Sequence, residues 1–216
     1  MRIARVPGVF RPRSDTWLLA EALRSRPRLA GGTVLDVCTG SGALAISAAR
    51  AGAAAVTAVD LSARAVLSVR LNARLNGVRV EALRGDLLAA VPGRRFDLIV
   101  SNPPYLPADD DALPARGTAR HTEAGRTGRV LLDRLIDAAP GHLVPGGELL
   151  VLHSSLNGEA ATLARMRAAG LQPAVAERRP GPLGPLLAAR APELEARGLL
   201  PTGDRSEELL VVSGAA

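Results

Sequence analysis

The stretch T-V-L-D-V-C-T-G-S-G-A-L-A, residues 33–45, decides the fold. Its first part is a short apolar run that is typical of a buried strand, and its last part begins a helical pattern of small apolar residues. Gly40 and Gly42 lie between the two parts. A strand, a glycine turn and a helix in this order are typical of a parallel sheet that binds a ligand at the carboxyl ends of its strands.

Strand-like and helix-like runs alternate along the rest of the chain. Strands are predicted at 33–38, 55–60, 78–84, 96–101, 147–153, 173–178 and 207–213. Helices are predicted at 15–25, 43–51, 62–76, 129–139 and 157–169. Ser62 and Asn157 are expected to cap helices, and Gly77 and Gly170 to end them. Because strands joined by helices pair in parallel, this order predicts an α/β, Rossmann-like, doubly wound and mostly parallel sheet with helices on both faces.

The chain of 216 residues is expected to form one domain with two distinctive segments. Residues 1–28 are a basic N-terminal segment and helix, with seven arginines against Asp15 and Glu21. Residues 180–205 are an insertion before the last predicted strand, with a short helical middle. We expect both segments to contribute to a surface that recognises a substrate or partner.

The composition excludes several classes of protein. We expect no membrane span, because the most apolar region, residues 43–59, contains Arg50 and Gly52. The N-terminus lacks the apolar stretch of a signal peptide. Cys38 is the single cysteine, which excludes an internal disulfide and favours a cytoplasmic protein. With so few cysteines and histidines we also expect no metal site.

The net charge of +6 and the pI of about 11.1 leave two interpretations open. All 27 basic residues are arginines, which raises the pI by itself, so a solvated basic surface can account for the charge. The uneven placement of the arginines is also compatible with binding to nucleic acid, which stays an alternative.

Carboxylates around the glycine turn indicate the kind of ligand. Asp60 ends the second predicted strand, twenty residues after Gly40, where an acid accepts hydrogen bonds from a ribose diol. Asp36 lies four residues before Gly40, where it would repel the pyrophosphate of a dinucleotide and favour a cation. S-adenosylmethionine carries both a ribose and positive charges, so these residues favour it as the cofactor. The alternatives are that Asp36 caps a backbone amide and that Asp60 caps a helix.

The third predicted strand adds the last part of this site. Asp86 follows it and could accept from an adenine amino group while Leu87 packs on the ring, although an ordinary Asx-turn is the alternative. All these residues fall at the carboxyl edge of a parallel sheet, where ligands bind. The predicted cofactor-binding residues of this edge are Asp36, Thr39, Gly40, Gly42, Asp60, Leu61, Asp86 and Leu87.

The fourth predicted strand ends in Asn102-Pro103-Pro104-Tyr105. A planar NH₂ nitrogen becomes positive when it takes a methyl group, and two acceptors aimed at its N–H groups stabilise that charge. The Asn102 side-chain oxygen and the Pro103 carbonyl can be these acceptors, Pro104 keeps the preceding residue extended, and Tyr105 offers a flat face. These four residues are therefore the predicted catalytic clamp, with Asn102 also beside the cofactor. The alternative is a proline-rich strand exit.

The segments F-D-L-I-V-S-N-P-P-Y, V-L-D-V-C-T-G-S-G-A-L-A-I and A-V-D-L-S-A-R-A-V together resemble the class I methyltransferases of the HemK type. The resemblance covers the chain from about Asp15 to its end. It implies a seven-stranded sheet with an antiparallel last strand, S-adenosylmethionine as cofactor, and methylation of a glutamine amide in translation release factors. It also implies that Asp15 and Thr16 contact the methionine part of the cofactor.

The chain departs from this family in three places, all on the side expected to meet the substrate. It starts too close to its first strand for the N-terminal helical domain of the longer bacterial members. In this it resembles the short branch, which works with a small zinc-binding partner subunit. The loop at 121–128 has Ala124-Gly125 where the family usually has two glycines, and the 180–205 insertion is long.

Other functions remain open at this stage. The same clamp would serve an adenine amino group of nucleic acid, although such an enzyme must hold a flipped base with aromatic partners that are scarce here. A peptide or small-molecule N-methyltransferase is a second alternative, and a cofactor-binding subunit without activity is a third.

Overall fold

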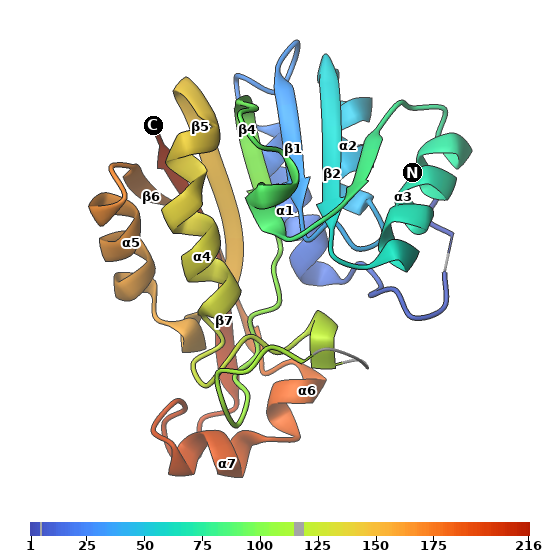
Figure 1. Ribbon diagram of the computed structural model, residues 1–216. Helices are drawn as coiled ribbons and strands as arrows, with labels where there is room; N and C mark the ends of the chain where they lie inside the picture. Colours follow the sequence, from blue (N-terminus) through green and yellow to red (C-terminus); the bar gives the residue numbers. More distant parts are fainter. Residues whose placement is uncertain (5, 115–118) are drawn as a thin grey trace.

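A seven-stranded sheet forms the centre of the computed structural model, which describes residues 1–4, 6–114 and 119–216 (Figure 1). The strands are β1 (Thr33–Val37), β2 (Ala55–Asp60), β3 (Glu81–Arg84), β4 (Phe96–Ser101), β5 (Leu143–Ser154), β6 (Gln172–Pro182) and β7 (Ser206–Ala215). Their order is β3-β2-β1-β4-β5-β7-β6, and β7 alone runs antiparallel to its neighbours. The predicted α/β fold, with its antiparallel last strand, is confirmed.

Helices cover both faces of this sheet. The α-helices are α1 (Ser14–Arg24), α2 (Ala43–Arg50), α3 (Ala63–Leu75), α4 (Val130–Ala138), α5 (Glu159–Ala168), α6 (Pro185–Ala188) and α7 (Ala191–Ala196). Short 3₁₀ turns are η1 (Leu87–Ala90), η2 (Ala119–His121), η3 (Ala139–His142) and η4 (Ser155–Asn157). Helices α1, α2 and α3 cover one face and bury one apolar core, while α4 and α5 cover the other face and bury a second. Among the described residues, no helix is long and apolar enough to cross a membrane.

Several predicted boundaries move for identifiable reasons. β1 ends one residue early because Cys38 adopts a left-handed φ of 59°. β3 starts at Glu81 instead of residue 78, since the Val78 N–H bonds back to the Ala73 carbonyl and closes the end of α3. Ser62 caps α3 as predicted, by accepting from the Ala65 N–H.

The prediction that Asn157 caps α5 is wrong, because Gly158 holds that position. The Asn157 side chain points inward instead and donates to the backbone carbonyls of Tyr105 and Thr127 at 2.7 and 3.0 Å. Gly77 and Gly170 follow the ends of α3 and α5 with positive φ angles, as predicted.

The insertion forms a small core of its own beyond the end of the sheet (Figure 1). β6 runs on to Pro182 and pairs there with Ser206, so the connection between the two strands is 183–205 instead of the predicted 180–205. Its buried residues are Leu183, Leu187, Ala191, Leu194 and Leu200. Leu106, directly after the Asn-Pro-Pro-Tyr motif, packs against this core. The insertion therefore supports the chain segment that leaves β4.

Two arginines of the insertion strengthen this support. Arg190 donates to the Pro107 carbonyl at 2.6 Å, and Arg197 donates to the Ala108 carbonyl at 2.8 Å. Glu193 accepts from both arginines, and these contacts lower its pKa to about 2. The loop after the motif is thus held by charged hydrogen bonds as well as by apolar contact.

The N-terminal segment lies along α3 and is held there by two asparagines one turn apart. Asn76 exchanges hydrogen bonds with the backbone of Arg2, and Asn72 does the same with Ala4. Asn72 is fully buried and also donates to the Ser41 carbonyl in the glycine turn at 3.0 Å. One side chain therefore connects the N-terminal segment, α3 and the glycine turn.

We predict that Asn72→Ala lowers the free energy of unfolding by about 2–4 kcal/mol, because buried backbone groups lose their partners. Asn76→Ala is the matched control, and its loss should stay below about 1 kcal/mol since water can reach the groups that it leaves. Urea denaturation of both variants measures the difference. Equal losses in the two variants would contradict the role given to Asn72.

Candidate active site

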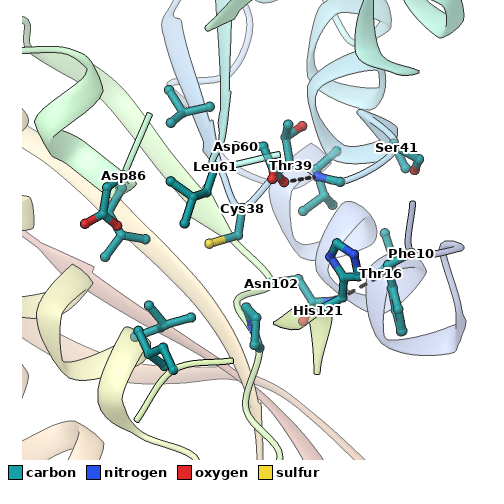
Figure 2. A pocket seen from close by; sticks show the side chains of 18 of the residues that line it. Phe10, Thr16, Cys38, Thr39, Ser41, Asp60, Leu61, Asp86, Asn102 and His121 are labelled. Atoms are coloured by element: carbon teal, nitrogen blue, oxygen red, sulfur yellow. Dashed lines mark hydrogen bonds between the residues drawn. The ribbon is translucent and has the colours of Figure 1, made fainter. Parts of the chain in front are cut away.

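A pocket opens at the carboxyl ends of β1, β2, β3 and β4, at the point in the sheet where the strand order reverses (Figure 2). Eight of the predicted cofactor-binding residues line it: Thr16, Thr39, Gly40, Asp60, Leu61, Asp86, Leu87 and Asn102. Asp36 and Gly42 do not line it, and Asp15 lines a second pocket next to the first. We call the first pocket the donor pocket.

The glycine turn and Asp60 form one rigid wall of the donor pocket. Asp60 accepts from the Gly40 N–H at 2.9 Å and from the Ser62 N–H at 2.8 Å. Both glycines have positive φ. A Cβ on Gly40 would meet nothing within 4 Å, whereas one on Gly42 would come within 3.1 Å of Val69. Gly40 thus leaves room for a ligand, and Gly42 lets α3 approach the turn.

Asp36 lies fully buried beneath this turn. One of its oxygens accepts from the Thr39 hydroxyl at 2.5 Å and from the Ala45 N–H at 3.0 Å, so it fixes the turn to the start of α2. Burial raises its pKa to about 7. Its other oxygen is buried without a hydrogen-bond partner among the described residues. The alternative that Asp36 caps a backbone amide therefore holds for one of its oxygens. The other oxygen remains able to accept a hydrogen bond.

At the far side of the donor pocket, Asp86 forms an ion pair with Arg134 of α4 at 2.6 Å. Both side chains are half-exposed and line the pocket. The Asp86 side chain accepts no backbone N–H at the start of η1, so the Asx-turn alternative does not describe it. Leu61 and Leu87 line the same pocket with apolar surface, and Figure 2 shows Leu61 between Asp60 and Asp86.

The second pocket, which we call the acceptor pocket, adjoins the donor pocket at Asn102. Four residues line both: Phe10, Asn102, Pro104 and His121. Pro103 and Tyr105 line the acceptor pocket alone, so the structure brings the four predicted clamp residues together around it. The loop residues His121 and Thr122 and the insertion residues Gly184–Leu187 form its outer wall.

The orientation of Asn102 follows from its neighbour Asp15. The Asn102 amide nitrogen donates to Asp15 Oδ2 at 3.0 Å, with a longer contact to the Thr16 hydroxyl at 3.5 Å. An ionised carboxylate can only accept, so the amide nitrogen must face it. Asn102 Oδ1 is therefore turned away, and it is buried without a partner in the described part of the chain.

Tyr105 is fixed at both ends. Its hydroxyl donates to Asp15 Oδ2 at 3.4 Å, and its backbone carbonyl accepts from Asn157 at 2.7 Å. Burial, followed by the charge of Asp15, raises the pKa of the hydroxyl, which therefore stays protonated. Gly128 lies directly against that carbonyl, because a Cβ there would come within 2.0 Å of the oxygen.

Sequence reasoning missed three residues that line these pockets, Phe10, Arg134 and Glu207, and also Asn157, which supports Tyr105 from behind them. Phe10 carried a signal, because the chain has only four aromatic side chains. Glu207 carried another, as an acid at the start of an apolar strand. Arg13 of the basic N-terminal segment lines the acceptor pocket, while Arg5 lies outside the described residues.

Comparison with known proteins places this architecture in a family. The family described as methyltransferase small domain matches residues 1–115. The chain belongs to this methyltransferase family. A release factor glutamine methyltransferase of Bordetella pertussis is 44% identical over 177 residues, which is 78% of this chain and 65% of that protein. This methyltransferase chain thus spans about two thirds of the length of that relative.

Two further relatives match almost their whole length. A protein of Methanocaldococcus jannaschii, provisionally named a protein N5-glutamine methyltransferase, is 33% identical over 86% of this chain and 92% of its own. The E. cuniculi Mtq2–Trm112 complex, described as methylating the eRF1 translation termination factor, aligns with a TM-score of 0.65 at 26% identity. That alignment covers 96% of this methyltransferase and 98% of the matched chain. The resemblance predicted from the sequence is confirmed.

We predict a graded loss of stability when alanine replaces three glycines of this methyltransferase. Gly128→Ala should cost about 2 kcal/mol or more, because a left-handed φ of 70° and a clash with the Tyr105 carbonyl add together. Gly40→Ala, with a left-handed φ and open space, should cost about 1 kcal/mol. Gly141→Ala meets neither obstacle and should be nearly neutral.

Urea denaturation ranks the three variants. If Gly128→Ala were no worse than Gly40→Ala, the close contact between Gly128 and the Tyr105 carbonyl would be contradicted.

Proposed function

We propose that this protein transfers a methyl group from S-adenosylmethionine to the side-chain amide nitrogen of a glutamine in a protein, with a translation release factor as substrate. The observation that carries this proposal is Asn102, which lines both the donor and the acceptor pocket and whose buried Oδ1 has no hydrogen-bond partner among the described residues. A buried acceptor without a partner costs free energy unless a ligand supplies a donor. An NH₂ group in the acceptor pocket supplies it.

The residues of the donor pocket fit S-adenosylmethionine. Asp60 has a carboxylate at the end of β2 for the ribose hydroxyls, and Asp86 lines the pocket together with Leu61 and Leu87 for the adenine. Asp36 keeps one oxygen without a hydrogen-bond partner among the described residues, and Gly40 leaves open space at the surface of the turn. Such a site favours a cation with a nucleoside over a pyrophosphate.

The clamp residues account for the chemistry at the acceptor nitrogen. When bound, the cofactor supplies a methyl group on a positively charged sulfur. An amide nitrogen is a weak nucleophile because its lone pair is delocalised, and positive charge develops on its N–H groups as it is alkylated. Asn102 Oδ1 and the Pro103 carbonyl accept from these N–H groups and stabilise that charge. Asp15 keeps Asn102 in this orientation through the contact described above.

Several further features support a protein substrate. Two of the curated relatives are named for glutamine methylation in proteins, and the Mtq2 complex is described as methylating eRF1. Phe10, Tyr105, Leu186, Leu187 and Leu209 give the acceptor pocket an apolar lining, which suits the aliphatic part of a glutamine side chain. We propose that the protein acts in the cytoplasm on a release factor, with a small partner subunit like that of Mtq2.

Asp60→Ala should weaken S-adenosylmethionine binding about tenfold to a hundredfold, because two hydroxyls lose a charged acceptor. Asp97 provides the matched control, since it also accepts a backbone N–H, from Thr33, but outside both pockets. Calorimetry on both folded variants measures the affinities. Unchanged binding in Asp60→Ala, or tighter binding of NAD than of S-adenosylmethionine to the wild type, would contradict the assigned cofactor.

The substrate class is tested with labelled S-adenosylmethionine and separate samples of a recombinant bacterial release factor, RNA and DNA. We expect label in the release factor at a glutamine, located by mass spectrometry. Label in RNA or DNA alone would overturn the proposed substrate. Asn102→Ala should lower kcat on the labelled substrate about 10²–10³-fold while the affinity for the cofactor changes little.

The contact between Asp15 and Asn102 permits a sharper test by exchange. Asn102→Asp alone should be nearly inactive, because it brings two carboxylates together at the position of the 3.0 Å hydrogen bond. The double variant Asp15→Asn/Asn102→Asp restores a donor and an acceptor. We expect its kcat to be at least tenfold higher than that of Asn102→Asp alone. Absence of any recovery would show that Asp15 does not orient this position.

A further inference from the structure

The acceptor pocket has a buried carboxylate that the clamp does not use. Glu207 lies at the start of β7 and is only 9% exposed, yet it lines this pocket. Its Oε2 accepts from the Ser154 hydroxyl at 2.6 Å, and its Oε1 accepts from the Gly184 N–H at 2.8 Å. Both contacts use it as an acceptor, as a carboxylate does. Glu207 is thus fixed in place and holds the start of α6 against the pocket.

A second buried carboxylate, Asp15, lines the same pocket. The Tyr105 hydroxyl lies within the field of both, since the charges of Asp15 and Glu207 each contribute to raising its pKa after burial. Among the described residues, neither carboxylate forms an ion pair. Arg13 is the arginine that lines this pocket; it is exposed and lies over the Phe10 ring.

Two buried carboxylates against one exposed arginine leave a net negative charge in this pocket, which gives it a definite preference. In a partly buried site, like charges a few ångströms apart repel strongly, because little water is present to screen them. A glutamine and a glutamate side chain have nearly the same shape, so shape alone cannot separate them. A charge in the wall can, because it disfavours the acid and leaves the neutral amide unaffected.

We propose that Glu207 is a specificity-determining residue, and that its charge makes the acceptor pocket take an uncharged amide side chain and reject the isosteric acid. This inference rests on the proposed function. Its hydrogen bond to Gly184 also makes the 183–205 insertion part of the acceptor site, so that α6 presents Leu186 and Leu187 to the substrate.

The test uses two forms of the release factor that cannot be methylated. The glutamine located by mass spectrometry is replaced by glutamate in one form and by methionine, a neutral residue of similar length, in the other. Inhibition constants of both forms are measured against the unmodified release factor. For the wild-type enzyme, we expect the glutamate form to bind at least tenfold more weakly than the methionine form.

Three variants separate the charge from the structural contact. Glu207→Gln removes one charge at constant size while Asp15 stays in place, so the ratio of the two inhibition constants should fall at least threefold below the wild-type ratio. Ser154→Ala removes one hydrogen bond but keeps the charge, and the ratio should stay as in the wild type. Glu208→Gln is the matched control, because Glu208 is the next residue and pairs with Arg178 away from both pockets.

Each outcome decides the matter. A wild-type ratio near one overturns the inference without any variant, and so does a Glu207→Gln ratio equal to that of the wild type. An equal fall in Ser154→Ala shows that the contact, and not the charge, sets the preference, which also overturns it. A wild-type enzyme that binds S-adenosylmethionine but labels no release factor overturns the proposed substrate, and the inference with it.

Discussion

The hydrogen bond from Asn102 to Asp15 is the constraint on which the candidate active site depends. It joins the end of β4 to the first turn of α1, two elements 87 residues apart in the chain. It also gives the Asn102 amide a single direction, with its oxygen turned away from Asp15. The Tyr105 hydroxyl donates to the same carboxylate, so Asp15 positions the side chains of both Asn102 and Tyr105.

In the donor pocket, too, a small number of aspartates fix the backbone. Asp36 holds the glycine turn to α2, and Asp60 holds it to the start of α3. Asp60 also lines the donor pocket, whereas Asp36 is fully buried behind its wall. The acids that shape the turn therefore also set the charge and the outline of this pocket.

The sequence predicted the sheet from periodicity and glycine turns, and the resemblance to a known family implied its antiparallel last strand. The four residues of the Asn-Pro-Pro-Tyr motif were predicted to lie together, and they line one pocket. The sequence did not predict contacts that need the folded chain. Its position in the sequence predicted that Asn157 caps a helix, yet its side chain turns inward and donates to the Tyr105 carbonyl. Arg134 meets the donor pocket only through tertiary placement, and no local spacing marks it. Glu207 stands out as an acid at the start of an apolar strand, but its place in the acceptor pocket depends on the folded chain.

The separate core of the insertion has a consequence for how this enzyme can change. Its five buried residues pack on one another and on Leu106, and they belong to neither of the two cores on the faces of the sheet. Substitutions in 183–205 can therefore reshape one wall of the acceptor pocket while the cofactor turn and the sheet keep their packing. Divergence among such proteins can alter which macromolecule is modified and leave the methyl-transfer apparatus intact.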